Sequence, residues 1–188
     1  MAINISAVNN GDAFVVDIAP NTNYGGNALL YCYSQDGTGG NYQSYLNFTL
    51  PSGVGAISAI ALFLYCQGVD YTQDFTLELH QVTSFWSEMV VTYNLRPCYS
   101  GTILSSRTLS SLSGGNWYSF DISSYPGITW GSTVSLVLLP NPYNRTRGSG
   151  NGSYFPSRDG VSNKPYVQIT YTPSFVPGAA LLGELAGA

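Results

Sequence analysis

The sequence predicts an all-β fold, an antiparallel β-sandwich or jelly roll that forms a single domain. Short runs rich in β-branched and aromatic residues recur along the chain, and clusters of Gly, Asn, Pro and Ser separate them. No segment keeps the apolar period of a helix, and only residues 125–131 (YPGITWG) have room for one short turn. A chain of 188 residues is long enough for one domain with a sizeable core.

The predicted strands alternate apolar and polar residues at least in part, as a strand does when one face lies against a core. In chain order they are residues 57–67 (ISAIALFLYCQ), 74–82 (DFTLELHQV), 116–123 (NWYSFDIS), 133–140 (TVSLVLLP) and 165–173 (PYVQITYTP). Several short strands at this spacing are typical of sandwiches and jelly rolls. Two Gly-rich segments, 34–41 and 141–153, are predicted loops, and loops on a rigid sheet often carry binding residues.

Charge is scarce in this chain. Only 9% of the residues are charged, against roughly 25% in an ordinary soluble protein, and there are fifteen Tyr. The surface must therefore consist largely of Ser, Thr, Asn, Gly and Tyr. The net charge is −4 and the six basic residues are scattered, whereas nucleic-acid binding relies on clustered Lys and Arg. The composition therefore excludes nucleic acid as a partner.

The two ends of the chain are predicted to lie outside the sandwich, which we place at residues 10–173. Residues 1–9 form an N-terminal segment without the basic and apolar pattern of a secretory signal. Residues 174–188 form an apolar C-terminal tail, too short for a membrane span, which takes about 20 residues. We expect the tail to dock on a neighbouring subunit, because burial of each large apolar side chain stabilises by roughly 1.5–3 kcal/mol.

Several short motifs occur in a recognisable order: GDAFV, PNTNYGG, SYLNFTLP, HQVTSFWSEMVVTYNLRP, WYSFDIS and FPSRDGVSNKPYVQITY. Together they resemble the DNRLRE-type domain, a family related to carbohydrate-binding modules, from about Asn10 to Thr172. The resemblance implies a β-sandwich module that usually accompanies enzymes or surface proteins, with polysaccharide binding in some members. A fold does not dictate a function, so the resemblance supports the fold more than the ligand.

The resemblance also implies a framework role for the charged stretch of residues 85–97 (FWSEMVVTYNLRP), in which Trp86 packs at the sandwich edge. We expect Glu88 to lie partly buried in an ion pair with Arg96 or Arg158, and separation from every Arg by more than about 6 Å would exclude the pair. Removing one partner of such a buried pair costs several kcal/mol. Ligand contact and catalysis are the alternatives for this stretch.

The sequence predicts a non-enzymatic protein. Its ten acids mostly occur singly in turns or at strand ends, His80 is the lone histidine, and neither a GxSxG nor a HExxH motif is present. We predict no cofactor, with Ca²⁺ as the open alternative through Asp12 and Asp36. Ca²⁺ takes six to eight oxygens, and each of these two loops gathers only one carboxylate.

The cysteines and the glycosylation sequons have structural interpretations. Three cysteines, Cys32, Cys66 and Cys98, allow at most one disulfide within the chain, and we expect buried or edge thiols. Four N-x-S/T sequons occur, and we expect the one at Asn47 to lie in a strand. The candidates for surface glycosylation are therefore Asn4, Asn144 and Asn151.

A glycan site needs exposed aromatic faces with a few polar groups beside them. The candidates are Tyr24, Tyr42, Tyr143, Arg145 and Arg147, in or next to the Gly-rich segments. With fifteen Tyr, however, some are exposed on any fold, and Tyr24 belongs to a motif suited to turn formation. Six scattered cations offer little basic groove, which argues against acidic polysaccharides.

Two function classes follow from these observations. The first is a structural subunit of an extracellular, virion or cell-surface assembly such as a spike, appendage or filament, which contacts copies of itself and attaches to glycans or a host surface. Low charge, a single module and the apolar tail favour it. The alternative is a monomeric polysaccharide-binding module of a secreted protein. The first class predicts assemblies that collapse when residues 174–188 are deleted, and the second predicts a monomer held by a glycan surface.

Overall fold

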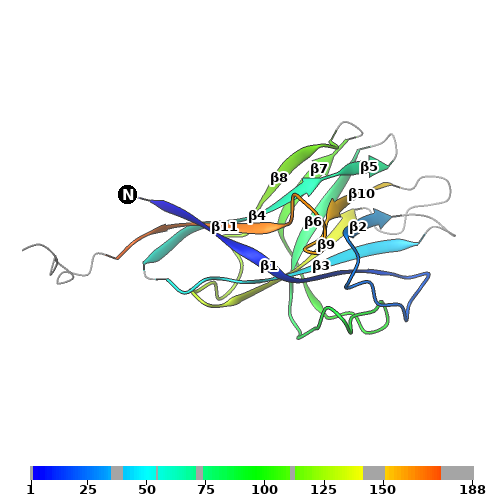
Figure 1. Ribbon diagram of the computed structural model, residues 1–188, viewed down its shortest axis with the longest axis horizontal. Coiled ribbons are helices and arrows are strands. Elements are labelled where there is room, and N and C mark those ends of the chain that lie inside the picture. Colours follow the sequence, from blue (N-terminus) through cyan, green and yellow to red (C-terminus); the bar gives the residue numbers. More distant parts are fainter. Residues whose placement is uncertain are drawn as a thin grey trace, which may run out of the picture.

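The computed structural model is all-β, with eleven antiparallel strands (Figure 1), and describes residues 2–34, 40–53, 55–70, 74–110, 113–141 and 151–174. The strands are β1 (Ile3–Val16), β2 (Leu29–Ser34), β3 (Asn41–Thr49), β4 (Ala56–Cys66), β5 (Gly68–Asp70), β6 (Phe75–Val82), β7 (Tyr99–Leu109), β8 (Asn116–Asp121), β9 (Thr133–Asn141), β10 (Asn151–Pro156) and β11 (Tyr166–Thr172). The predicted single-domain β-sandwich is thus confirmed. Residues 125–131 contain turns and no helix.

Strand β1 belongs to both layers of the sandwich. Its residues 3–8 pair with β11, which continues the first layer through β4 to β8. Its residues 9–16 pair with β3, which leads through β9 and β6 to β7 in the second layer. The pairing shifts between Asn9 and Gly11, as at a β-bulge, so the strand changes layer there. Residues 3–9, predicted as a separate segment, are therefore paired within the sandwich.

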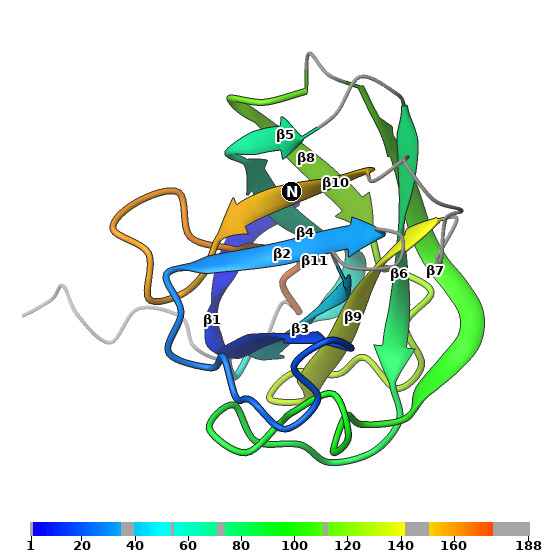
Figure 2. The ribbon, with the colours of Figure 1, turned by 90° about the vertical axis from the view of Figure 1, so that its right-hand side faces the viewer.

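The main core lies between the layers, and the strands surround it in Figure 2. In β4, Ile60, Leu62 and Leu64 point inward and are at most 2% exposed, because every second side chain of a strand faces the same side. Burial of a Leu or Phe side chain stabilises by roughly 1.5–3 kcal/mol. The intervening Phe63 and Tyr65 point away from this core.

The loop of residues 83–98 covers the outer face of the second layer. Trp86 and Val91 pack on Tyr45, with the ring centroids of Trp86 and Tyr45 5.8 Å apart. The Trp86 indole N–H donates a hydrogen bond to Ser135 Oγ at 2.8 Å. This stretch therefore builds a second apolar cluster, and it carries Glu88 toward β1.

All three cysteines carry free thiols, with Cys32 and Cys66 buried and Cys98 exposed. Within the described residues, no helix is long and apolar enough to cross a membrane. Several predicted features lie outside the described residues: Asp36, Tyr143, Asn144, Arg145, Arg147 and the tail beyond Ser174.

Candidate functional site

Four aromatic side chains form a continuous surface on the outer face of the first layer, which we call the aromatic strip: Phe63, Tyr65, Trp117 and Tyr166. Strand pairing places Tyr65 opposite Trp117 and Phe63 opposite Tyr166. Side chains at directly paired positions share one face of a sheet. The strip therefore runs from β8 across β4 to β11.

The rings of the strip touch one another in sequence. Phe63 and Tyr166 are stacked with centroids 4.9 Å apart and planes 2° from parallel. Trp117 meets Tyr166 at 5.4 Å and Tyr65 at 5.5 Å, in both cases edge to face. Trp117 is 41% exposed and the other three rings are half-buried. Mutual packing holds these rings in place, so the strip presents a preformed apolar surface to solvent.

A row of smaller and polar side chains lies beside the strip. Ala61 pairs with Asp121 on one side and with Gln168 on the other, and Gln168 pairs in turn with Ser6. Two hydrogen bonds from Ser123 hold the pKa of Asp121 below its usual range, and the bond from the side chain has a larger effect than the bond from the backbone. This row therefore offers a carboxylate, an amide and a hydroxyl next to apolar rings.

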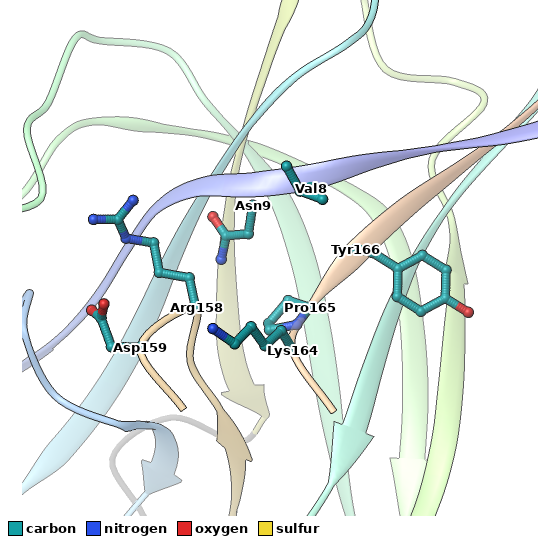
Figure 3. A pocket seen from close by; sticks show the side chains of 7 residues that line it. All are labelled: Val8, Asn9, Arg158, Asp159, Lys164, Pro165 and Tyr166. Atoms are coloured by element: carbon teal, nitrogen blue, oxygen red, sulfur yellow. The ribbon is translucent and has the colours of Figure 1, made fainter. Parts of the chain in front are cut away.

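Open pockets flank both ends of the β4–β11 part of the strip. One has a volume of about 430 Å³ and is shown in Figure 3; its lining residues are Val8, Asn9, Arg158, Asp159, Lys164, Pro165 and Tyr166. The other, of about 480 Å³, includes Tyr65, Gln67, Val161 and Asn163 in its lining. Both pockets border the loop of residues 157–165, so this loop separates two hollows next to the strip.

Three carboxylates lie close together and form what we call the acidic cluster: Asp12, Glu88 and Asp159, of which Asp159 also lines the first pocket. Each contributes an oxygen, and these oxygens lie within 4.8 Å of one another. The Arg158 Nε lies 2.8 Å from Glu88 Oε1. The Nε–H group of Arg158 does not point at a hydrogen-bond acceptor, so this contact is an ion pair and not a hydrogen bond. Glu88 Oε1 also accepts a hydrogen bond from the backbone N–H of Asp12 at 3.0 Å.

Asp12 is 1% exposed, and only one of its oxygens is hydrogen-bonded. Oδ2 accepts from Asn9 Nδ2 at 2.6 Å and from the backbone N–H of Arg158 at 2.8 Å, whereas Oδ1 has no partner. Burial raises the pKa of Asp12 to about 7, against the lowering effect of the bond from Arg158. The neighbouring negative charges of Glu88 and Asp159 also contribute to this rise.

Of the two arginines considered for Glu88, Arg158 makes the contact. Arg96 instead lies over the ring of Tyr93, 3.9 Å from its centroid, and donates to the Tyr93 carbonyl at 2.5 Å. Arg96 is thus held by its own loop, although it is much nearer to Glu88 in sequence. The sequence left both arginines open as partners of Glu88, and packing distinguishes them.

Tyr24 and Tyr42, the described members of the predicted glycan set, lie in a different aromatic group with Phe14, Tyr31 and Tyr33. Tyr24 stacks on buried Phe14 at 4.3 Å, and Tyr42 contacts Phe14 at 5.8 Å. Both tyrosines are half-buried. As binding residues they stay a prediction.

The described sequons occupy strands. Asn4 is exposed in β1 and its Oδ1 accepts from Thr170 Oγ1 at 2.8 Å, while Asn151 begins β10. Their glycosylation stays a prediction. The aromatic strip was missed in the sequence, although one signal was available: Phe63 and Tyr65 alternate with inward Leu62 and Leu64, which identifies two rings on one outward face.

Comparison with known proteins adds a family. A model of carbohydrate-binding module family 96 matches residues 5–171. The matched range contains the aromatic strip, the first pocket and the acidic cluster. It is consistent with the predicted relation to carbohydrate-binding modules, but it does not confirm the DNRLRE-type assignment. None of the curated proteins compared with the chain matches it.

Proposed function

This chain belongs to carbohydrate-binding module family 96, and we propose that it binds a polysaccharide through the aromatic strip. The observation that carries the proposal is the strip itself: four rings in mutual contact on a solvent-facing sheet, with Trp117 41% exposed. Ligand sites combine preformed apolar and aromatic surface with a few convergent polar groups. The outer face of the first layer has both.

The chemistry of a sugar chain matches this face. One side of a pyranose ring consists of C–H groups and can pack flat on an aromatic ring, whose faces carry partial negative charge. The hydroxyls at the ring edge need donors and acceptors, which Asp121, Gln168 and Ser6 supply in the adjacent row. Because the strip crosses three strands, it can contact successive residues of an extended chain. A polymer is therefore a better ligand than a monosaccharide.

We infer a binding module without catalysis, since families of carbohydrate-binding modules usually bind and do not cleave. Such modules commonly occur in extracellular or surface proteins, which supports an extracellular or cell- or virion-surface location. The low charge of the chain, 9%, fits a surface that recognises neutral hydroxyl-rich ligands.

The test compares Trp117→Ala with Tyr99→Ala. Tyr99 is 39% exposed in β7 of the other layer, so its substitution removes a similarly exposed ring away from the strip. Retention on soluble polysaccharides in affinity gels, after a glycan-array screen, gives the affinity. Trp117→Ala should weaken binding by about 30-fold or more, the loss expected for a central Trp contact worth about 2 kcal/mol. Tyr99→Ala should bind as the wild type does.

Two outcomes would contradict this site. Wild-type affinity in Trp117→Ala would remove the strip from the binding surface. Loss of binding in Tyr24→Ala with retention in Trp117→Ala would move the site to the second aromatic group, as the sequence predicted. Absence of binding to any glycan by the wild type would contradict the function itself.

A second candidate is the structural subunit of a surface assembly that attaches to glycans. The observation that favours it is exposed apolar surface on the loop of residues 83–98, where Phe85 is 95%, Met89 66%, Val90 60% and Leu95 66% exposed. Exposed apolar patches commonly mark contacts between proteins. Light scattering of the full chain and of a chain ending at Pro173 distinguishes the candidates. An assembly of the full chain supports the subunit, with contacts through the tail if it dissociates on truncation and through the loop if it persists. Two monomers support the independent module.

A further inference from the structure

We propose that the acidic cluster binds a Ca²⁺ ion, with Asp12, Glu88 and Asp159 as its protein ligands. The three residues come from β1, from the loop of residues 83–98 and from the loop of residues 157–165. Only the folded chain brings them together, and their oxygens lie within 4.8 Å of one another. Calcium–oxygen distances are about 2.4 Å, so two ligands of one ion can be up to about 4.8 Å apart. The cluster therefore has the dimensions of a calcium site.

The second observation is the unpartnered oxygen of Asp12. The side chain is 1% exposed, and its Oδ2 is already occupied by Asn9 and by the backbone of Arg158. Its Oδ1 is buried without a hydrogen bond. Buried polar atoms nearly always have a partner, and an exception calls for an explanation such as an ion. A cation among the three carboxylates would supply the missing partner.

The charge of the cluster points the same way. When all three carboxylates are ionised they carry three negative charges, and the Arg158 guanidinium beside Glu88 offsets one of them. Two negative charges remain, which a divalent cation balances. Among the described residues the printed ion pairs do not join Arg158 to Asp12 or Asp159, so the arginine leaves their oxygens available.

The donor set selects the kind of metal. All three ligands are carboxylates, which suit hard cations, whereas Zn²⁺ sites typically include His or Cys. Mg²⁺ requires a near-ideal octahedron at about 2.0–2.1 Å, and Ca²⁺ accepts irregular sets of six to eight oxygens. Asp159 is exposed and borders the first pocket, so water can complete the coordination (Figure 3). This combination favours Ca²⁺.

A cation here would add a direct link among three segments that already meet through the hydrogen bonds of Asp12 with Glu88 and Arg158 and through the Arg158–Glu88 ion pair. Asp159 is in the loop that also carries Lys164 and leads into Tyr166 of the aromatic strip. Fixing Asp159 against Asp12 and Glu88 would therefore fix the loop between the two pockets. The proposed ion is structural, and its binding does not depend on the glycan function.

The experiment uses the full chain, freed of divalent ions with EDTA and then titrated with CaCl₂. Thermal unfolding measures the stabilisation, and calorimetric titration measures the affinity and stoichiometry. At a free Ca²⁺ concentration 100 times Kd, the unfolding temperature should rise by about 5–10 °C for a domain of this size. The variants are Asp159→Asn, whose exposed side chain tolerates substitution, Asp12→Asn, and Asp74→Asn as an exposed acid outside the cluster.

The proposal predicts one Ca²⁺ per chain, a response lost in Asp159→Asn and in Asp12→Asn, and an unchanged response in Asp74→Asn. Three results would overturn it: no stabilisation of the wild type, a response that persists in both cluster variants, or equal stabilisation by MgCl₂. Asp159→Asn keeps the test valid if Asp12→Asn does not fold, since Asp159 is exposed. Glycan binding is measured separately, so either proposal can fail alone.

Discussion

Substitution of Gly25 by alanine tests whether the stability of the fold requires a residue without a side chain at this position. Gly25 is in the turn that packs on Glu88, and a Cβ there would lie 2.2 Å from the Glu88 carbonyl oxygen and 2.8 Å from its Cγ. Gly26 is the matched control, because a Cβ added to it meets nothing within 4 Å. Neither glycine has a positive φ, so backbone strain does not distinguish the two.

The loss of stability in Gly25→Ala depends on which atoms the new methyl group displaces. The added methyl has to retreat by about 1 Å to reach van der Waals distance, and the atom it meets first belongs to the backbone. Such a shift stretches the bonds from Asn23 Nδ2 to the carbonyls of Glu88 and Val91, now 2.8 and 2.7 Å long. Each hydrogen bond contributes about 0.5–1.5 kcal/mol net, and overpacking costs about 1–3 kcal/mol. We expect Gly25→Ala to lose about 2–4 kcal/mol.

Urea denaturation followed by tryptophan fluorescence measures both variants. Gly26→Ala should stay within about 0.5 kcal/mol of the wild type or gain slightly, because alanine reduces the entropy of the unfolded chain. If Gly25→Ala is as stable as Gly26→Ala, the close packing of this turn on Glu88 is not a constraint on the fold, and the steric argument fails.

Two further predictions concern the core. Native protein at pH 8 should react with a thiol reagent at Cys98 alone, and at all three cysteines in denaturant, because Cys32 and Cys66 are buried. Fast labelling of three native thiols at pH 8 would contradict the burial. Burial also raises the pKa of Cys66 to about 11 from about 8.5. The neutral thiol therefore favours the folded state at neutral pH, and this contribution to stability is lost as the pH rises toward 11. Trp86→Ala should cost about 3–5 kcal/mol in urea denaturation because it empties the second cluster. Trp86→Phe should cost about 1–3 kcal/mol because it mainly loses the bond to Ser135. Equal costs would mean that the hydrogen bond, and not the packing of the ring, holds the loop.

The position of the aromatic strip could not be predicted from the sequence. Tyr24 and Tyr42 stand out in Gly-rich segments, which usually lie at the surface, and this made them candidates. Both are half-buried against Phe14 or other rings. Trp117 and Tyr166 lie in predicted strands, where aromatic residues are ordinarily assigned to a core. Which face of a strand is outward depends on its register with its neighbours.

The metal candidates show a similar division. The turn-like sequence around Asp12 made it a candidate ligand, but its loop holds one carboxylate, and no sequence pattern joins it to Glu88 and Asp159. The bulge between Asn9 and Gly11 carries β1 from one layer to the other and brings Asp12 to the meeting point of two loops. Such a site is assembled from three distant segments.

The sequence by itself determined the fold class, because alternation of apolar and polar residues is a local property that each strand carries independently. The resemblance of its motifs to a known family also implied a framework role for the stretch of residues 85–97. Tertiary structure alone decided that Arg158 and not Arg96 meets Glu88, and that rings from β4, β8 and β11 adjoin. The reason is physical: strand pairing and loop packing are set by the free energy of the whole chain, and no short segment contains that information.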